Sequence, residues 1–290
     1  MNTTAAPSRS YLFVPGNRPE RFDKAMASGA DAVILDLEDA VPESDKDSAR
    51  DAVARWLCEC ASTKSDAGTT QIFVRINACG STQHEQDVRA CHPWAKGVIL
   101  PKSEHVIDIA ALARAMPAAA LLPLIETAVG IATSLDLARA PGVSRLVFGT
   151  IDFQHDLGID GEGDELLLFR SQLVLNSRLA GLSAPIDGIS TVLDNAVQIQ
   201  AEANRARRLG FGGKLCIHPR QLAPVHDAFN PTAAQLDWAC RVLAAADAAH
   251  GAAVALDGTM VDRPVILRAQ ALLERASQSL SFTQTRVNLS

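Results

Sequence analysis

Eight short apolar runs separated by helical patterns limit this chain to very few folds. The runs span residues 10–17, 30–39, 71–77, 97–102, 121–127, 145–152, 183–188 and 213–219. Short apolar runs bounded by turn residues indicate buried strands. The intervening segments include two helical patterns, 165–182 and 195–211, which Gly181 and Gly210 close. Eight strands that alternate with helices predict a (β/α)8 TIM barrel.

An open, doubly wound sheet is the alternative fold for such a pattern. No G-x-G-x-x-G motif follows a strand, so the sequence gives no support for a dinucleotide site. We therefore predict a barrel domain at 8–230 and a C-terminal extension at 231–290. In the extension we predict a helix from Thr232 to His250, a glycine-containing excursion and a helix from Pro264 to Ser277. We expect it to be an appendage without a core of its own.

The charge balance and the apolar pattern exclude several classes of partner. The net charge is −6, from 27 basic and 33 acidic residues, and no basic cluster suggests nucleic-acid binding. The first ten residues lack the apolar core of a signal peptide, and no apolar run approaches membrane-spanning length. The six cysteines form no C-x-x-C pair, which argues against a zinc site. We expect a soluble, cytoplasmic protein without a membrane partner.

Polar residues gather at the ends of the predicted strands. In a TIM barrel the loops after the strands form the mouth that carries the chemistry. The residues at these ends are Asn17, Arg18, Glu38, Asp39, Arg75, Asn77, Lys102, Glu126, Asp152, Asp187 and His218. Any one of these residues is more simply explained by a structural role. Together they form a ring of polar residues around the predicted mouth, which we call the polar ring, and this ring indicates a functional site.

Two carboxylates in this ring favour a magnesium site. Glu126 and Asp152 close neighbouring predicted strands. Mg²⁺ binds one or two protein carboxylates and completes its shell with water and substrate oxygens. Thr127 is placed to cap the following helix, which would fix the direction of the Glu126 side chain. The alternative is that both acids merely cap neighbouring helices.

The stretch AVILDLEDAV, residues 32–41, delivers Asp36, Glu38 and Asp39 at or just past a buried strand. Clustered acids repel one another and lose hydration on burial, so a cation would offset the penalty. Helix capping or a surface salt-bridge rim is the alternative. Arg75 follows an apolar stretch and offers a bidentate fork to a substrate carboxylate or carbonyl. It can also form a buried ion pair with Glu38 and Asp39, and both roles can hold together.

Several ordered motifs carry a resemblance to a known family. They are RSYLFVPGNRPERFDKA, GADAVILDLEDAV, VRIN, GVILPKSE, PLIETAVGI, FGTIDFQHDLG and GFGGKLCIHPRQLAPV. The chain resembles the CitE-like (HpcH/HpaI) family, which contains the citrate lyase beta subunit and stand-alone acyl-CoA lyases. The resemblance implies a Mg²⁺-dependent carbon–carbon lyase or synthase that acts beside a CoA thioester.

The same resemblance assigns roles to residues of the ring. It implies that Glu126 and Asp152 hold Mg²⁺ and that Arg75 binds the 2-oxo acid. It places Glu38 and Asp39 near the metal through waters. Of the three acids in AVILDLEDAV, Asp36 is then the one most easily read as structural.

Two departures from the family pattern bear on the reaction. Related members commonly read Gly-Ala-Glu-Asp where this chain reads Gly149-Thr150-Ile151-Asp152. The acid for the metal is retained, but Ile151 replaces a glutamate, which favours the citramalyl-CoA lyase-like branch. The related HpaI-type aldolases carry Glu-His after the second strand. Here Asp39 follows Glu38, so that mechanism lacks its histidine base.

The extension carries a further similarity, in DGTMVDRPVILRAQALLERA. This segment resembles the lid of acyl-CoA lyases, in which an aspartate reaches the active site of the next subunit of a trimer. Asp262 matches that aspartate and becomes a candidate general acid or base. Spacing alone makes Asp262 a helix N-cap ahead of Arg263 and Pro264. The resemblance favours the lid role and a homotrimer.

Basic residues after the first strand are candidates for binding CoA phosphates. They are Arg18, Arg21 and Lys24, for which a solvated basic helix face is the alternative. His218 either shapes the CoA channel or caps the eighth strand.

The leading functional expectation is a cytoplasmic, Mg²⁺-dependent lyase that cleaves (3S)-citramalyl-CoA to acetyl-CoA and pyruvate. The alternatives are a malyl-CoA lyase or malate synthase-like enzyme, a citrate lyase beta subunit, and a non-catalytic CoA-binding protein.

Overall fold

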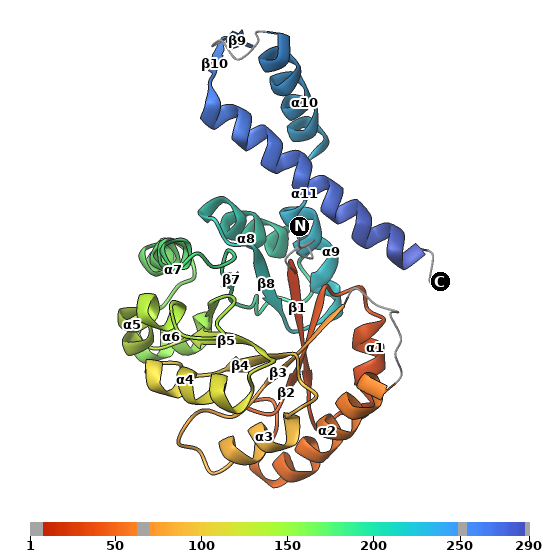
Figure 1. Cartoon of the computed structure of the whole chain (residues 1–290), viewed down its shortest axis with the longest axis vertical. Helices are drawn as coiled ribbons and strands as arrows, with labels where there is room; N and C mark the ends of the chain where they lie inside the picture. The colour runs from red at the N-terminus through yellow and green to blue at the C-terminus, as the bar shows by residue number, and fades with distance from the viewer. Residues whose placement is uncertain (1–7, 63–69, 249–253, 288–290) are drawn as a thin grey trace. The chain divides into compact units, whose positions relative to one another are not determined.

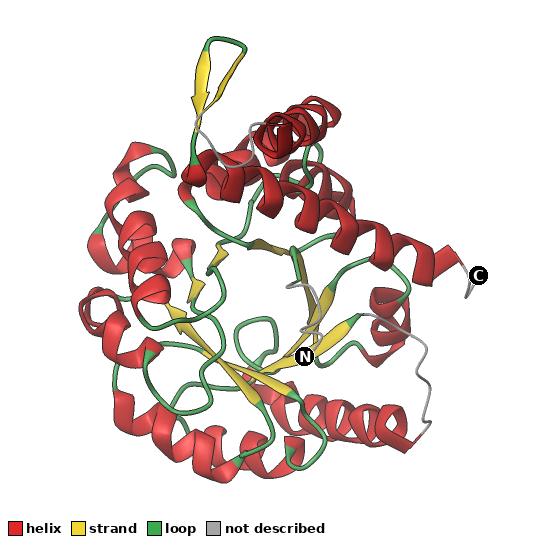
Figure 2. Cartoon of the chain, turned by 45° about the horizontal axis from the view of Figure 1, so that its top comes forward, coloured by secondary structure: helices red, strands yellow, loops and turns green. Residues whose placement is uncertain are grey.

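The computed structural model describes residues 8–62, 70–248 and 254–287. Eight parallel strands close into a barrel in chain order. Figure 1 labels the strands, and Figure 2 shows the ring of strands inside the helices. The strands are β1 Ser10–Pro15, β2 Ala32–Asp36, β3 Gln71–Arg75, β4 Gly97–Leu100, β5 Ala120–Ile125, β6 Val147–Phe148, β7 Ile186–Asp187 and β8 Gly213–Cys216. The predicted (β/α)8 barrel is therefore confirmed.

Helices connect consecutive strands around the outside of the barrel (Figure 2). The connecting helices are α1 Phe22–Met26, α2 Lys46–Ser62, α3 His84–Cys91, α4 Val106–Ala115, α5 Ala128–Ala138, α6 Thr150–Leu157, α7 Leu167–Leu179 and α8 Ala196–Leu209, and α9 Leu222–Phe229 follows β8. Gly210 ends α8 in the left-handed conformation, with φ of 105°. Gly181 follows α7 with φ of 73°. Both glycine stops are confirmed, because glycine adopts this conformation without a steric penalty.

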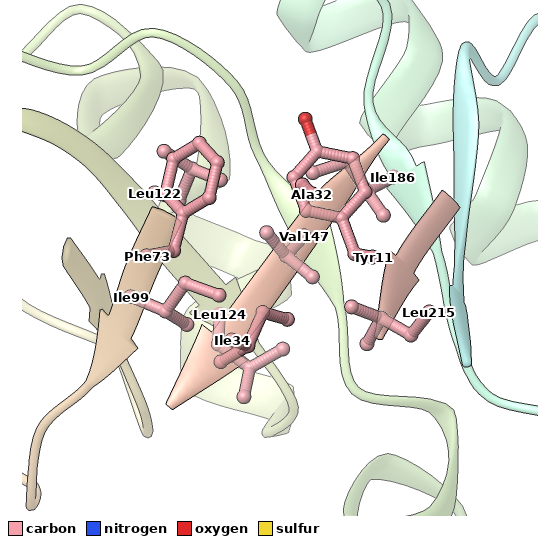
Figure 3. Close-up of a cluster of buried hydrophobic side chains, with 10 residues drawn as sticks. All are labelled: Tyr11, Ala32, Ile34, Phe73, Ile99, Leu122, Leu124, Val147, Ile186 and Leu215. Carbon is pink, nitrogen blue, oxygen red and sulfur yellow. The ribbon is translucent and has the colours of Figure 1, made fainter. Parts of the chain in front are cut away.

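A cluster of apolar side chains fills the barrel interior (Figure 3). Successive side chains of a strand point to opposite faces, so every second residue faces inward. The inward-facing cluster consists of Tyr11, Ala32, Ile34, Phe73, Ile99, Leu122, Leu124, Val147, Ile186 and Leu215. These residues identify the inward-facing positions of each strand. A residue an even number of positions further along the same strand has the same parity, so it also points inward, and near the strand end it faces the mouth.

Strands β6 and β7 are shorter than the sequence predicts. The apolar runs suggest strands at 145–152 and 183–188, whereas only two residues of each run pair as a strand. Strand β6 ends because Gly149 is the N-cap of α6, which begins at Thr150. The second half of the run therefore forms the first turn of a helix.

Asp187 does not face the mouth, although the sequence places it in the polar ring. Its neighbour Ile186 points inward, so the Asp187 side chain points outward between the sheet and the helices. Arg170 Nε donates to Asp187 Oδ1 at 2.9 Å, and Lys214 Nζ lies 3.5 Å from Oδ2. All three side chains are almost fully buried. Asp187 therefore belongs to a structural ion network.

Replacing Asp187 with Asn is expected to destabilise the barrel by about 3–5 kcal/mol, because Arg170 and Lys214 would remain buried without their anion. Burial alone raises the pKa of Asp187, but Lys214 and Arg170 outweigh burial and hold that pKa below its ordinary value of 3.8. The stabilisation is thus complete above 3.8 and is lost as the pH falls through the lower, folded-state pKa. Thermal unfolding across acidic pH should show the gap between wild type and variant closing at low pH. The exposed Asp160→Asn is the control, and an equal shift in both variants would contradict this role.

The described residues from Ala228 onward belong to a second compact unit. It contains α10 Ala233–Ala248, the strands β9 Val254–Leu256 and β10 Thr259–Val261, and α11 Arg263–Val287. β9 and β10 pair antiparallel around Asp257 and Gly258, whose φ angles are 50° and 75°. Positive φ at both loop residues is the geometry of a type I′ hairpin turn, for which Asp-Gly is a preferred sequence. The sequence prediction described this hairpin only as a glycine-containing excursion.

The second unit has its own hydrophobic cluster, so the prediction of an appendage without a core was wrong. Ala239 and Val242 of α10, Val261 of β10, and Ala269 and Leu272 of α11 are buried together. Two helices and a hairpin together form this cluster. Helix α11 runs to Val287, past its predicted end at Ser277. The predicted end of α10 at His250 lies outside the described residues.

None of the helices in the described ranges combines the length and the apolar character needed to span a membrane.

Candidate active site

The inward-facing positions become polar at the carboxyl ends of three strands. Asp36, Arg75 and Glu126 each follow an inward apolar residue by two positions, which gives them the same parity. Asp36 and Arg75 are directly paired in the register of β2 and β3. All three line one cavity of about 370 Å³, together with Asp152. The rest of its wall is largely apolar and includes Phe13, Leu124, Ile151, Ile189, Leu215 and Ile217.

Arg75 is held from several sides. Its Nε donates to Asp36 Oδ1 at 2.7 Å, and its Nη2 donates to Asp36 Oδ2 at 2.6 Å. Its Nη1 lies 2.8 Å from Glu38 Oε2 and 3.7 Å from Asp39 Oδ2. The guanidinium also stacks over the Phe13 ring, 4.9 Å from its centroid. Burial alone lowers the pKa of Arg75, but the neighbouring carboxylates outweigh burial and keep the group charged.

Asp36 is the acid whose importance the sequence reasoning missed. The predicted ion pair of Arg75 with Glu38 and Asp39 is present. The bidentate hydrogen-bonded pair, however, is between Arg75 and Asp36. Asp36 also accepts hydrogen bonds from the backbone N–H groups of Glu38 at 2.9 Å and Ala40 at 3.2 Å. The signal was available, because Asp36 shares the parity of the inward Ile34.

Glu38 and Asp39 occupy the loop after β2 in different environments. Glu38 is buried, and Asp39 is exposed. The pKa of Glu38 is raised to about 7, mainly because the group is buried. The charge of Arg75 lowers this pKa, but repulsion from Asp39 and Asp36 adds to the effect of burial. Lys102 Nζ lies 3.6 Å from Glu38 Oε1 and supplies a second nearby positive charge.

Glu126 is almost fully buried at the end of β5. The backbone N–H of Lys102 donates to Glu126 Oε1 at 2.8 Å. Lys102 has φ of 47°, which is uncommon for a residue other than glycine. Thr127 caps α5 by accepting from the Gly130 N–H at 3.0 Å, which confirms the predicted cap. Burial raises the pKa of Glu126 to about 8, and the neighbouring charges of Glu38 and Asp152 contribute.

Asp152 reaches the same cavity from a helix. The sequence places it at the end of a strand, whereas the structure places it as the third residue of α6. Gly149, between β6 and α6, lies against Glu126: a Cβ at position 149 would be 2.6 Å from Glu126 Oε2. Only glycine leaves room for the Glu126 carboxylate, so Gly149 allows the two acids to share one pocket.

The acids around this cavity suit a small divalent cation. Glu126 and Asp152 supply hard oxygen donors. Burial and the neighbouring carboxylates raise the pKa of Glu126, and a cation would offset that cost of keeping it charged. Within the described ranges, no group of three or more His, Cys, Asp or Glu side chains is arranged to hold a metal. Two carboxylates completed by water and substrate oxygens match the way Mg²⁺ binds to proteins.

The basic residues named as CoA candidates lie after β1. Arg18, Arg21 and Lys24 are exposed, and Arg21 has an ion pair of 3.8 Å with Glu20. This placement is compatible with a phosphate cradle and with a solvated face. His218 caps the turn after β8, because its Nδ1 accepts from the Arg220 N–H at 3.1 Å. The capping alternative for His218 is therefore confirmed.

Asp262 is exposed and stands at the start of α11 in the second unit. Its Oδ1 accepts a hydrogen bond from the Val265 N–H at 3.2 Å. Asp262 is thus the helix N-cap that its spacing indicates. The cap uses only Oδ1 of the Asp262 carboxylate. The role of Asp262 as a general acid or base stays a prediction.

Comparisons with known proteins match the chain along most of its length. Residues 9–219 match the family described as "HpcH/HpaI aldolase/citrate lyase". A "Citrate lyase subunit beta-like protein" of Deinococcus radiodurans is 38% identical, over 94% of this chain and 99% of that protein. A "(3S)-malyl-CoA thioesterase" of Cereibacter sphaeroides is 32% identical, over 96% of this chain and 98% of that protein.

A solved structure extends the similarity to three dimensions. It is protein CitE from Mycobacterium tuberculosis in complex with magnesium, acetoacetate and coenzyme A. The TM-score is 0.81 and the sequence identity 35%, over 94% of this chain and 99% of the CitE chain.

Proposed function

The chain belongs to the HpcH/HpaI aldolase/citrate lyase family, and on that premise we propose that it is a Mg²⁺-dependent acyl-CoA lyase. Its leading substrate is (3S)-citramalyl-CoA, which it cleaves to acetyl-CoA and pyruvate. One observation carries the proposal: Arg75, Glu126 and Asp152 line a single cavity. The magnesium and coenzyme A in the similar CitE structure support the choice of cofactor and thioester.

The proposed cleavage follows from the substrate's own bonds. A base removes the proton of the tertiary hydroxyl, and the carbon–carbon bond beside it breaks as the oxygen becomes a carbonyl. The electron pair of that bond passes to the CH₂ group next to the thioester, which gives the enolate of acetyl-CoA. An acid then protonates that carbon. We assign the proton transfers to Asp262 of a neighbouring subunit, and the binding of the carboxylate and carbonyl oxygens to Arg75.

Glu126 and Asp152 would hold the Mg²⁺, with Glu38 and Asp39 contacting its waters. When bound, the ion polarises the hydroxyl and carboxylate oxygens of the substrate as a Lewis acid. Asp36 and Phe13 keep Arg75 in place, and the apolar wall excludes water from the reacting carbons.

The remaining assignments of the proposal concern CoA, the assembly and the compartment. Arg18, Arg21 and Lys24 would contact the phosphates of CoA. The working unit would be a homotrimer, since Asp262 would act on the site of a neighbouring subunit. The compartment would be the cytoplasm.

Ile151 supports citramalyl-CoA over its relatives. The side chain is 41% exposed and lines the cavity directly beside Asp152. Citramalyl-CoA carries a methyl group on the carbinol carbon, where malyl-CoA carries hydrogen and citryl-CoA carries a carboxymethyl group. An isoleucine favours the methyl group and disfavours a second carboxylate.

A panel of citramalyl-, malyl- and citryl-CoA, each with and without Mg²⁺, tests the function. Release of both acetyl-CoA and a 2-oxo acid identifies a lyase. Free CoA thiol without a 2-oxo acid would instead identify a thioesterase, the activity named for the Cereibacter relative. Binding of CoA without turnover of any ester would leave a non-catalytic CoA-binding protein.

Ile151→Ala in the same panel tests the substrate preference. We expect the ratio of kcat/KM for citramalyl-CoA to that for malyl-CoA to fall by about tenfold, because a single methyl contact is worth roughly 1–3 kcal/mol. Ile107→Ala, which alters a 72% exposed residue on α4, is the matched control. An unchanged ratio in Ile151→Ala would show that another wall selects the acyl group.

A further inference from the structure

Arg75 has two buried acidic neighbours that hold it in different ways. Asp36 is 1% exposed, and each of its two carboxylate oxygens accepts two hydrogen bonds. Each oxygen accepts one hydrogen bond from Arg75 and one from the backbone of the following loop. Its side chain cannot move without breaking four hydrogen bonds, so Asp36 is a fixed partner.

Glu38 is held by charge alone. Its Oε2 lies 2.8 Å from Arg75 Nη1, but the contact lacks hydrogen-bond geometry. Within the described part of the chain, no other donor reaches this buried oxygen. The other oxygen, Oε1, lies 3.6 Å from the half-exposed Nζ of Lys102. The Glu38 side chain can therefore rotate toward Lys102, because no hydrogen bond holds its Oε2 in place.

The guanidinium of Arg75 carries five N–H donors. Asp36 takes the Nε–H and one Nη2–H, and Glu38 faces Nη1. A substrate carboxylate that binds through Nη1 meets Glu38 at the same edge. Three N–H donors remain beside the pair with Asp36, but two carboxylates at Nη1 repel each other, which favours displacement of the one that is held by fewer hydrogen bonds.

We infer that Glu38 is an exchangeable counter-ion of Arg75, which the substrate carboxylate displaces, whereas Asp36 is the fixed positioning residue. The inference rests on the proposed function in one respect, namely that Arg75 binds the carboxylate of the 2-oxo acid. Glu38 neutralises Arg75 in the free enzyme and turns toward Lys102 when substrate arrives. Removing the two acids should therefore have opposite effects on affinity for the 2-oxo acid.

Calorimetric titration of pyruvate, in the presence of Mg²⁺ and at a pH above the Glu38 pKa of about 7 so that this carboxylate is charged, tests this division of roles. Glu38→Gln should bind pyruvate roughly threefold more tightly or better, because the competing charge is gone. Asp36→Asn should bind it about tenfold more weakly or worse, because Arg75 loses a charged hydrogen-bond partner. Asp39→Asn removes the same charge from the same loop, 3.7 Å from Arg75 and exposed to water. Its effect should be smaller than that of Glu38→Gln.

The outcomes separate this inference from the proposed function. Failure of the wild type to bind pyruvate overturns both. Binding by the wild type with unchanged or weaker binding by Glu38→Gln overturns the inference alone. Thermal unfolding checks that each variant is folded, and if Asp36→Asn is not, the Glu38→Gln titration decides. A purely structural role for Glu38 gives no gain in affinity.

Discussion

Replacing Glu126 with Gln, or Asp152 with Asn, is expected to abolish Mg²⁺-dependent turnover while the barrel stays folded. Each change removes one of the two carboxylates proposed to hold the ion directly. The loss of affinity should exceed the roughly 10- to 100-fold that follows when a metal site loses an outer-shell partner. Isothermal titration of Mg²⁺ and assays across a range of Mg²⁺ concentrations measure both effects.

The amide variants keep the size of each side chain, so they test charge and coordination rather than packing. Glu126→Gln also removes a buried carboxylate whose pKa is raised to about 8, and the fold should tolerate that change. Asp164→Asn, at an exposed position after α6, is the control for a change of net charge. Wild-type turnover that survives exhaustive chelation would refute the metal role.

Asp262→Asn is expected to reduce turnover by roughly 10²-fold or more, the usual contribution of general acid–base catalysis. Binding of the CoA ester should change less. The structure makes this substitution especially informative, because Asp262 also caps α11 through its Oδ1. Asparagine is as good an N-cap as aspartate, so the variant keeps the helix and removes only the acid. Asp262→Ala is the comparison, because it loses both the cap and the acid.

Mixing two inactive variants tests whether Asp262 serves a neighbour. Asp262→Asn retains Arg75, and Arg75→Ala retains Asp262. Under conditions that allow subunit exchange, some sites in mixed oligomers combine an intact barrel with an intact Asp262, and activity should partly return. A fully active monomer, or no recovery after demonstrated exchange, would mean that Asp262 is only a cap.

The sequence pattern was sufficient for the barrel because local signals there agree. Each strand is a short apolar run, and residues such as Thr127 and Gly210 mark where helices begin and end. The pattern failed where the signals conflicted. The run through Gly149 to Asp152 is apolar enough for a strand, but it forms a helix start. The Asp-Gly pair at 257–258 was a hairpin signal that the prediction did not use.

The partners within the site were harder to predict than its members. The sequence identified Arg75, Glu126 and Asp152, and the structure places them on one cavity. The alternation of side chains along the strand was enough to place Asp36 in the mouth. It could not show that Asp36, rather than Glu38, forms the hydrogen-bonded pair with Arg75, because that pairing depends on the register of two strands whose paired residues lie 39 positions apart. Parity was also needed to place Asp187 outside the mouth.

The contrast between Gly149 and Ile151 bears on how the active site can be re-engineered. Any side chain at 149 would press on the Glu126 carboxylate, so this position is closed to variation. Two residues later, Ile151 faces the open cavity from the first turn of α6. A library that randomises Ile151, Ile189 and Ile217 and keeps Gly149 would therefore sample new acyl groups without disturbing the carboxylates. The barrel mouth would thus separate the wall that can evolve new selectivity from the carboxylates proposed to hold the metal.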